Sequence, residues 1–387
     1  MKHFYQTHRN RVIFRSAVVF LLFAGVNFSV FGQTIGDYRS INDGNWAAAT
    51  SWERFTGTGW VPATTAPGLT TPSVTIRSGF NIRWNTAVGA LNVPLLILEG
   101  NGFLEVRSNR TLNINTGSIV RLAGSDFIRR QNTITSIINF NAGSVCELTR
   151  NGTTTIPVAN WNQDSTLKFL NPGGNLTYNN ITQTFGNIEY NRPLQSANQT
   201  AFLPNNLSGN FTLVNTGSFT LVLNNNDPER IITVGRDFIL NGGTLQFSGA
   251  TTNREAFLDV NRDINLNGGS FNNTLSPDSG FYFVGNGVQQ NFSSSIVLST
   301  QINQRFFRIA VSGPSRINQT YQGSALQSTI WGIPQSPDYL PVQTATSLFG
   351  DITINNPAGV TLSTAQTINQ NLFLTNGTLT NSTNNIV

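Results

Sequence analysis

The amino-acid sequence predicts an all-β protein that forms a right-handed parallel β-helix, a solenoid with coils of about 26 residues. Three observations lead to this fold class. Short apolar–polar alternations recur along the chain, a five-residue turn motif repeats, and three of the intervals between its copies are 26 residues. An irregular β-sandwich built from hairpins is the alternative that these observations leave open.

The alternating runs predict β-strands because successive side chains of a strand point to opposite faces. Asn-Gly, Gly-Gly and Asn-Asn turn signals separate the runs, and no sustained helical period follows residue 33. The clearest runs are 73–78, 95–100, 103–108, 111–117, 211–217, 219–224 and 351–356.

The turn motif consists of Asn, any residue, Gly, Ser or Thr, and an apolar residue. It begins at Asn115, Asn141, Asn215, Asn241 and Asn267. The interval from Asn141 to Asn215 is longer than the others and is close to three such periods. A fixed period of this size predicts stacked structural units.

Stacking places equivalent residues of neighbouring coils about 4.8 Å apart. We therefore expect two interior columns of apolar side chains. One contains Phe219, Leu245 and Phe271, and the other contains Val214, Leu240 and Leu266.

The motif also predicts a structural ladder at the turns. Its amide members, which can hydrogen-bond from coil to coil, are Asn215, Asn241 and Asn267. Its glycines, which we expect at positive φ in the bend, are Gly217, Gly243 and Gly269.

The ends of the chain differ from the repeats, and three segments follow. Residues 1–32 are a predicted signal peptide, 33–72 an N-terminal cap and 73–387 the β-helix repeats. Trp46, Trp52 and Trp60 are the expected core of the cap, which a solenoid needs at its terminal coil. The sequence stops in repeat register without a second cap, so we expect an open C-terminus that results from truncation.

Most of the formal net charge of +5 originates in the first segment. Lys2, Arg9, Arg11 and Arg15 precede an apolar stretch at 16–31, which is short for a membrane span. We expect cleavage after Gly32 and export through the Sec route to the extracellular space or outer cell surface, without a transmembrane span in the mature chain. An uncleaved anchor is the alternative. The remaining chain is nearly neutral, which disfavours nucleic acid as a partner.

The expected mature chain lacks histidine, because His3 and His8 both lie in the signal segment. This excludes catalysis by a Ser-His-Asp or Cys-His group and excludes zinc sites that use histidine. Cys146 is the only cysteine and stands in an alternating apolar pattern, so we expect a buried thiol without a disulfide.

The segment 36–82, with its GNW, TSWE and VTIRSG motifs, resembles the start of large secreted β-helix repeat surface proteins of the Bacteroidetes. The stretches 95–124 and 349–379 are similar to their repeats. This resemblance implies an adhesin-like protein exported as cargo of the type IX secretion system. The family pattern has His where this chain has Phe80, so we assign no catalytic role to that position.

The function that we expect is structural: an extracellular, adhesin-like solenoid without cofactor or catalytic residues. A polysaccharide lyase or glycoside hydrolase is the minority alternative, since a glycosidase needs two neighbouring carboxylates. The candidate pairs are Asp237 with Asp263 and Asp259 with Asp263. Arg236 and Arg262 precede two of these residues, which favours a solvated Arg–Asp ladder on the outer face.

Carbohydrate binding is a further alternative, with glycans, extracellular matrix or cell surfaces as partners. Trp161, Trp331 and Tyr339 are the candidate sugar contacts because they stand in less regular segments. Calcium is a weaker hypothesis that rests on Asp227 and Glu229 in the segment 224–229, where a plain turn is the competing interpretation.

Overall fold

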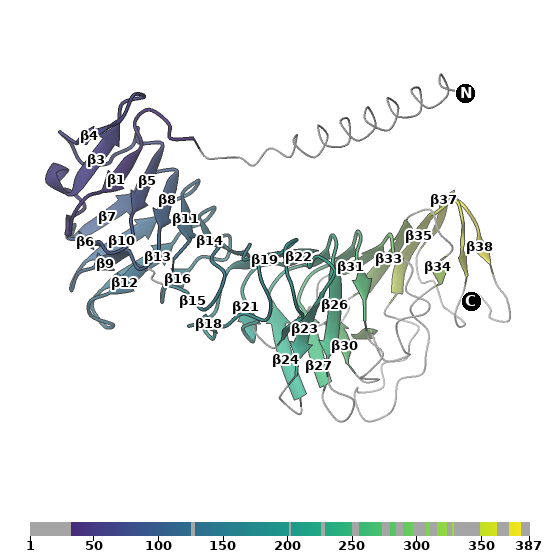
Figure 1. The fold of residues 1–387 in the computed structure, drawn as a ribbon. Coiled ribbons are helices and arrows are strands. Elements are labelled where there is room, and N and C mark those ends of the chain that lie inside the picture. The colour runs from purple at the N-terminus through teal and green to yellow at the C-terminus, as the bar shows by residue number, and fades with distance from the viewer. Residues whose placement is uncertain are drawn as a thin grey trace, which may run out of the picture.

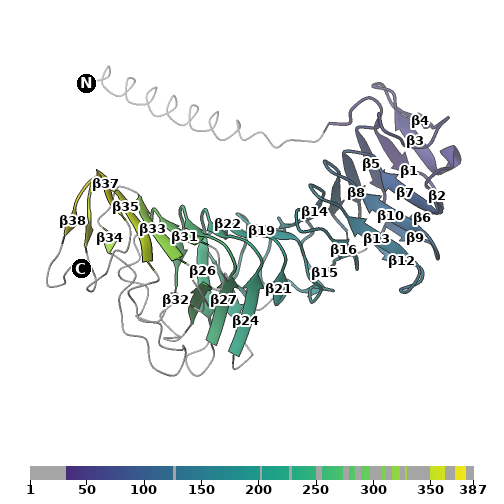
Figure 2. The same cartoon turned by 180° about the vertical axis from the view of Figure 1, so that it is seen from behind.

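The computed structural model describes residues 32–124, 128–200, 203–225, 229–249, 255–272, 279–283, 289–296, 307–309, 316–322, 327–328, 349–361 and 371–380. Within these ranges the chain forms a parallel β-solenoid, and its only helical element is the short 3₁₀ helix η1 (Ala49–Ser51). The strands stack along one axis, with β1 (Tyr38–Ser40) near one end and β37 (Leu372–Asn376) and β38 (Leu379–Thr380) at the other (Figures 1 and 2). The predicted fold class is confirmed.

A 16-stranded sheet runs the length of the solenoid, and we call it the long sheet. From its N-terminal edge the order is β4 (Trp60–Pro62), β3 (Trp52–Phe55), β1, β5 (Ser73–Ile76), β8 (Leu95–Leu98), β11 (Ile119–Leu122), β14 (Val145–Leu148), β17 (Thr166–Phe169), β19 (Asn187–Asn191), β22 (Phe211–Asn215), β25 (Phe238–Leu240), β28 (Ile264–Leu266), β31 (Gln289–Ser294), β33 (Arg316–Gln322), β35 (Phe349–Asn355) and β37. All pairs from β1 to β37 are parallel in this order, which excludes the sandwich alternative.

Two further sheets complete the N-terminal coils. The β2–β12 sheet contains β2 (Gly44–Asn45), β6 (Asn81–Trp84), β9 (Phe103–Val106) and β12 (Ile128–Arg130). The β7–β16 sheet contains β7 (Val88–Leu91), β10 (Thr111–Ile114), β13 (Ile137–Phe140) and β16 (Asn160–Trp161). Alternate residues of these strands are buried, so their apolar members fill the interior.

Different sheets complete the C-terminal coils. The β20–β29 sheet contains β20 (Gln199–Thr200), β23 (Thr220–Asn224), β26 (Thr244–Ser248) and β29 (Ser270–Phe271). The β21–β32 sheet contains β21 (Asn206–Leu207), β24 (Glu229–Val234), β27 (Glu255–Val260), β30 (Gly280–Phe283) and β32 (Phe307–Ile309). Two small sheets remain: β15 (Thr154–Thr155) with β18 (Tyr178–Asn179), and β34 (Gln327–Ser328) with β36 (Val360–Thr361) and β38.

The length of a coil varies along the axis around a mean of about 24 residues. The variation is visible between partners in adjacent strands of the long sheet. The coil from Cys146 to Leu167 is short, whereas the coil from Ile264 to Phe292 is long. Turns of different length contribute to this variation, and the ladders of β19 with β22, β33 with β35 and β35 with β37 also contain register shifts.

The repeated turn motif lies at two different corners of the coil. Asn115 and Asn141 follow β10 and β13 and lead into the long sheet, whereas Asn241 and Asn267 follow β25 and β28 and lead out of it. The interval between Asn141 and Asn215 therefore does not represent three whole coils. The motif interval agrees with the coil from Val120 to Cys146 and with the coil from Leu240 to Leu266.

The predicted interior column of Val214, Leu240 and Leu266 is wrong at one position. Leu213, not Val214, pairs with Leu240, because the coil between β22 and β25 is one residue longer than the motif interval. Leu213 is buried and Val214 is only half-buried. The additional residue in this coil thus places Leu213 in the interior column and leaves Val214 outside it.

The predicted column of Phe219, Leu245 and Phe271 is wrong at one position for a related reason. Leu221, not Phe219, pairs with Leu245, and Leu245 in turn pairs with Phe271 as expected. The segment between β22 and β23 is longer than that between β25 and β26, so equal spacing in sequence does not give equal position in the coil.

Two of the three cap tryptophans lie in the core at the N-terminal end. Trp52 is fully buried and Trp46 nearly so, and the Trp52 Nε1–H donates to the Trp46 carbonyl at 2.9 Å. Trp60 is half-buried on the outer face, with the Arg39 guanidinium 4.3 Å from its ring centroid. The antiparallel strands β3 and β4 extend the long sheet past β1, and Pro62 at its edge cannot donate a backbone hydrogen bond.

A polar cluster occupies the interior where one set of sheets replaces the other. Arg192 is fully buried there, and the partners of its guanidinium are neutral groups. The guanidinium donates to the carbonyls of Asn171, Gly173 and Gly174, to the Tyr190 hydroxyl and to the Gln199 side-chain oxygen. These five bonds satisfy all five guanidinium N–H groups, which makes burial of the cation tolerable.

Several sequence predictions fall outside the described residues: nearly all of the signal segment (1–31), Asp227, Trp331 and Tyr339. Over the described part of the chain, no helix has the length and hydropathy of a membrane-spanning segment.

Candidate functional site

A ladder of Asn and Asp side chains runs from coil to coil beside the long sheet. In each of four successive steps the Oδ1 atom accepts the backbone N–H of the equivalent residue one coil further on. The members are Asn187, Asn210, Asp237, Asp263 and Asn291, with N···O distances of 2.8, 3.0, 3.1 and 2.9 Å. We call this row the Asx ladder.

The Asx ladder has a sequence signature that a single fixed period does not reveal. Its first four members follow Gly or Arg and precede the first buried residue of a long-sheet strand, as in Gly186-Asn187-Ile188 and Arg262-Asp263-Ile264. The coil steps along the ladder are unequal, so a search at one period misses it. A search for Gly-Asn or Arg-Asp before an alternating run would find these four members.

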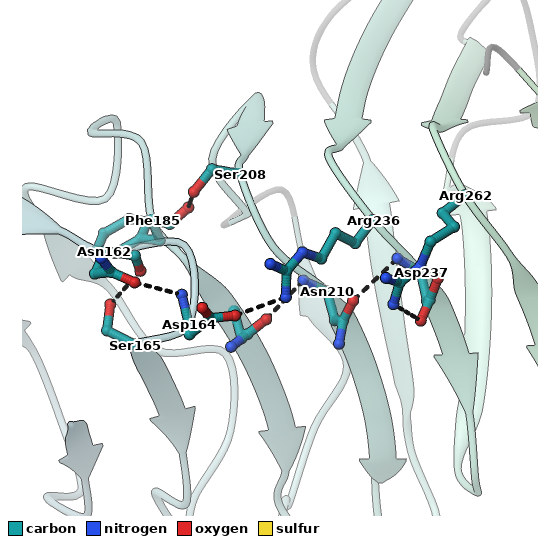
Figure 3. Close-up of polar contacts among 10 residues, drawn as sticks. Asn162, Asp164, Ser165, Phe185, Ser208, Asn210, Arg236, Asp237 and Arg262 are labelled. Atoms are coloured by element: carbon teal, nitrogen blue, oxygen red, sulfur yellow. Dashed lines mark hydrogen bonds and ion pairs between the residues drawn. The ribbon is translucent and has the colours of Figure 1, made fainter. Parts of the chain in front are cut away.

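Two arginines pair with carboxylates along this row (Figure 3). Arg262 binds Asp237 with both ends of its fork, at 2.6 Å from Nε and 2.5 Å from an Nη atom. The bond to Asp237 raises the pKa of the Arg262 guanidinium above its ordinary value. Arg236 reaches back to the Asp164 carboxylate at 2.6 Å. The Arg262–Asp237 contact joins neighbouring coils as the predicted Arg–Asp ladder requires, whereas Arg236 pairs with Asp164 and not with an aspartate of the repeats.

Glycines lie along the path of the Arg236–Asp164 ion pair, which spans more coils than the Arg262–Asp237 pair. Gly186 and Gly209 stand in the two coils between Asp164 and Arg236. A Cβ atom at Gly186 would overlap the Asn162 carbonyl oxygen, and one at Gly209 would overlap the Asn187 side chain. The close backbone packing at this corner therefore requires glycine at both positions.

The carboxylates that sequence reasoning offered to a glycosidase are engaged in the fold. Asp237 binds Arg262 and the Asp263 N–H, while Asp263 accepts the Asn291 N–H and its Nδ2 at 3.1 Å. Asp259 lies apart on β27 and is half-buried; burial, with the nearby charge of Glu229, raises its pKa to about 6. Both Asp237 and Asp263 are therefore members of the Asx ladder, in which each accepts a backbone N–H of the next coil.

The predicted structural ladder is formed only in part: the asparagines differ in their hydrogen-bond partners, whereas the glycines share a positive φ. Asn267 donates from Nδ2 to Asn241 Oδ1 at 2.9 Å, whereas Asn215 Oδ1 accepts the Gly217 N–H at 2.8 Å within its own turn. The coil from Leu213 to Leu240 is one residue longer than the motif interval, so Asn215 is out of register with Asn241. Gly217, Gly243 and Gly269 have φ of +60°, +76° and +81°.

A second group of amides lies on the outer face of the β7–β16 sheet. Asn139 Nδ2 donates to Asn113 Oδ1 at 2.7 Å, and Asn160 Nδ2 donates to Asn139 Oδ1 at 2.8 Å. At the adjoining corner, Asn141 Nδ2 donates to Asn115 Oδ1 at 2.9 Å. The amides thus form two parallel rows that run from coil to coil. The repeated turn motif of the sequence includes only the corner pair, Asn115 and Asn141.

Trp161, the one candidate sugar contact within the described residues, packs against the core. Its ring stacks on Phe140 at a centroid distance of 4.1 Å and meets Phe185 edge-on at 4.9 Å. Its Nε1–H donates to the Gln183 side chain at 3.1 Å. The ring is half-buried by these contacts, which leaves only part of its surface for a ligand.

Charges and metal ligands are sparse in the described ranges. No group of three or more His, Cys, Asp or Glu side chains there is arranged to hold a metal ion. Glu229 from the calcium hypothesis is exposed at the start of β24. Cys146 is a buried free thiol whose pKa is raised by desolvation.

Comparison of the chain with protein-family models, with curated proteins and with solved structures gives no match.

Proposed function

We propose that this chain is a structural, adhesin-like solenoid of the extracellular space or outer cell surface, without catalysis of its own. The observation that carries the proposal is the continuity of the outer ladders. The Asx ladder alone ties five successive coils together through side-chain bonds that add to the strand pairing. A stack reinforced in this way holds an extended contact surface in a fixed shape.

The distribution of polar groups supports the same proposal. Ion pairs such as Arg121–Glu147 at 2.8 Å and Lys168–Glu189 at 3.2 Å join neighbouring coils on the long sheet. The candidate catalytic carboxylates Asp237 and Asp263 are used in the same way. The predicted signal segment supports export, and an exported solenoid surface would meet other cells, matrix or glycans.

The test combines location, adhesion and catalysis. Protease treatment of intact cells should degrade the protein, and beads coated with the purified protein should adhere to cells or matrix more than beads coated with the unfolded chain. Polysaccharide solutions incubated with the protein should keep their chain length. Failure of adhesion together with measured polymer cleavage would refute the proposal.

A further inference from the structure

The outer face of the β7–β16 sheet combines three parallel rows, and each row continues from coil to coil. The first row is largely apolar and contains Val88, Thr111 and Ile137. The second contains Ala90, Asn113, Asn139 and Asn160. The third lies at the corner directly after the strands and contains Asn92, Asn115, Asn141 and Asn162. We call these rows together the amide strip.

The amide rows keep hydrogen-bonding capacity for a ligand. A carboxamide has two N–H donors and an oxygen with two lone pairs. Asn139 uses one donor toward Asn113 and one lone pair toward Asn160. One donor and one lone pair remain on such an amide, and they recur at about 4.8 Å along the axis.

The apolar row gives the strip a second kind of contact. Val88 is 70% exposed and Ile137 is 40% exposed, although both stand in well-formed strands. The apolar row and the central amide row occupy positions two residues apart on the same strands. The two rows are therefore separated by about 6.6 Å along the strand direction. A ligand that covers both rows needs an apolar face and a hydroxyl-bearing edge.

Charge narrows the class of ligand. The outward positions of the four strands carry no charged side chain. By contrast, the long sheet and the β2–β12 sheet present ion pairs such as Arg121–Glu147 and Arg107–Glu105. An anionic polymer has no opposite charge to pair with on the strip. A neutral polymer can bind there without burying a charged side chain that lacks a partner.

We propose that the amide strip binds an extended neutral polysaccharide that lies along the solenoid axis. Sugar hydroxyls both donate and accept, as the remaining amide groups require, and the C–H faces of sugar rings fit Val88 and Ile137. The repeat of the coils allows several sugar units to bind at once, so weak single contacts add along the chain. This inference rests on the proposed function and names the class of partner that the surface holds.

The experiment is native affinity electrophoresis of the purified protein in gels that contain a mixed-linkage β-glucan, a galactomannan or alginate. The strip variant carries Asn113→Ala and Asn115→Ala. The matched control carries Asn241→Ala and Asn267→Ala, which remove the same number of amides at another corner and break one ladder bond where the strip variant breaks two. The mobility of each protein is compared with its own mobility in a gel without polysaccharide.

At least one neutral polymer should retard the wild type and the control, and alginate should retard neither. The strip variant should bind about tenfold more weakly, since two hydrogen-bonding groups are lost. If that variant fails to fold, Val88→Asp serves instead, because its side chain is exposed and outside the ladders. Equal retardation of the wild type and these variants, equal retardation by alginate, or no retardation by either neutral polymer would overturn the inference. Persistent adhesion to cells in those cases would leave the proposed function standing.

Discussion

Two glycines at the same position of the turn motif, replaced by alanine one at a time, distinguish two sources of destabilisation. One is backbone strain within the turn, and the other is steric overlap with the neighbouring coil. Gly117 and Gly269 occupy the same place in the repeated motif and have almost the same φ, +80° and +81°. A Cβ atom at Gly117 would have no heavy atom within 4 Å. A Cβ atom at Gly269 would lie 2.6 Å from the carbonyl oxygen of Gly243 in the neighbouring coil.

The expected costs follow from these environments. Gly117→Ala should lower the local free energy of unfolding by about 1–2 kcal/mol, the cost of a left-handed alanine. Gly269→Ala should add about 1–3 kcal/mol of overpacking, because the contacted atoms belong to the backbone and cannot rotate away. The loss at Gly269 should therefore reach about 2–5 kcal/mol, the sum of the two costs.

Hydrogen exchange measured by mass spectrometry reports the local stability of each coil, which a global melting curve averages in a repeat structure. Protection should fall around β28 and β29 in Gly269→Ala far more than around β10 and β11 in Gly117→Ala. Equal losses in the two variants would show that the turn conformation alone, and not the stacking of coils, sets the cost.

The other predictions concern the polar groups. Asp237→Asn keeps the ladder acceptor and should cost less than about 1 kcal/mol, whereas Asp237→Ala removes it and should cost about 1–3 kcal/mol, both measured by hydrogen exchange around β28. Arg192→Lys reduces five donors to three and should destabilise the adjacent coils by more than about 2 kcal/mol in the same measurement; an unchanged exchange pattern would contradict the role of the cluster. Because burial raises the pKa of Asp259 to about 6 in the folded state, above its unfolded value, this group lowers stability increasingly as the pH rises from about 4 through 6. Asp259→Asn should therefore raise the thermal midpoint at pH 7.5 and leave it nearly unchanged at pH 4, and a constant difference across this range would refute the assignment. Cys146 should resist a thiol reagent in the native protein at neutral pH and react once the chain is unfolded, and rapid native labelling would contradict its burial.

The strands and turns were accessible from the sequence because their signals are local. All seven of the alternating runs named from the sequence contain strands, and the motif glycines have the positive φ that a tight bend requires. The burial of Cys146 was predicted from a local signal too, the alternation of apolar and polar residues around it. Each depends on a few neighbouring residues and not on the rest of the fold.

The Asx ladder and the amide strip were harder to see because they depend on register between coils. Asn113, Asn139 and Asn160 align although the second interval is shorter than the first. A single period cannot find such a row, since turns of different length separate its members. For the same reason the period misplaced Asn215, Val214 and Phe219 in their coils.

By itself, the sequence determined that the chain is a stack of short parallel strands, because alternation, turn residues and repetition are properties of the chain. The tertiary structure decided which side chains meet. It placed the same turn motif at two corners, paired Asp237 with Arg262 across coils, and gathered the amides of the β7–β16 sheet on one face. The physical reason is that side chains of neighbouring coils meet through hydrogen-bonded register, and one added residue in a coil changes which sequence positions meet across the two coils that it joins.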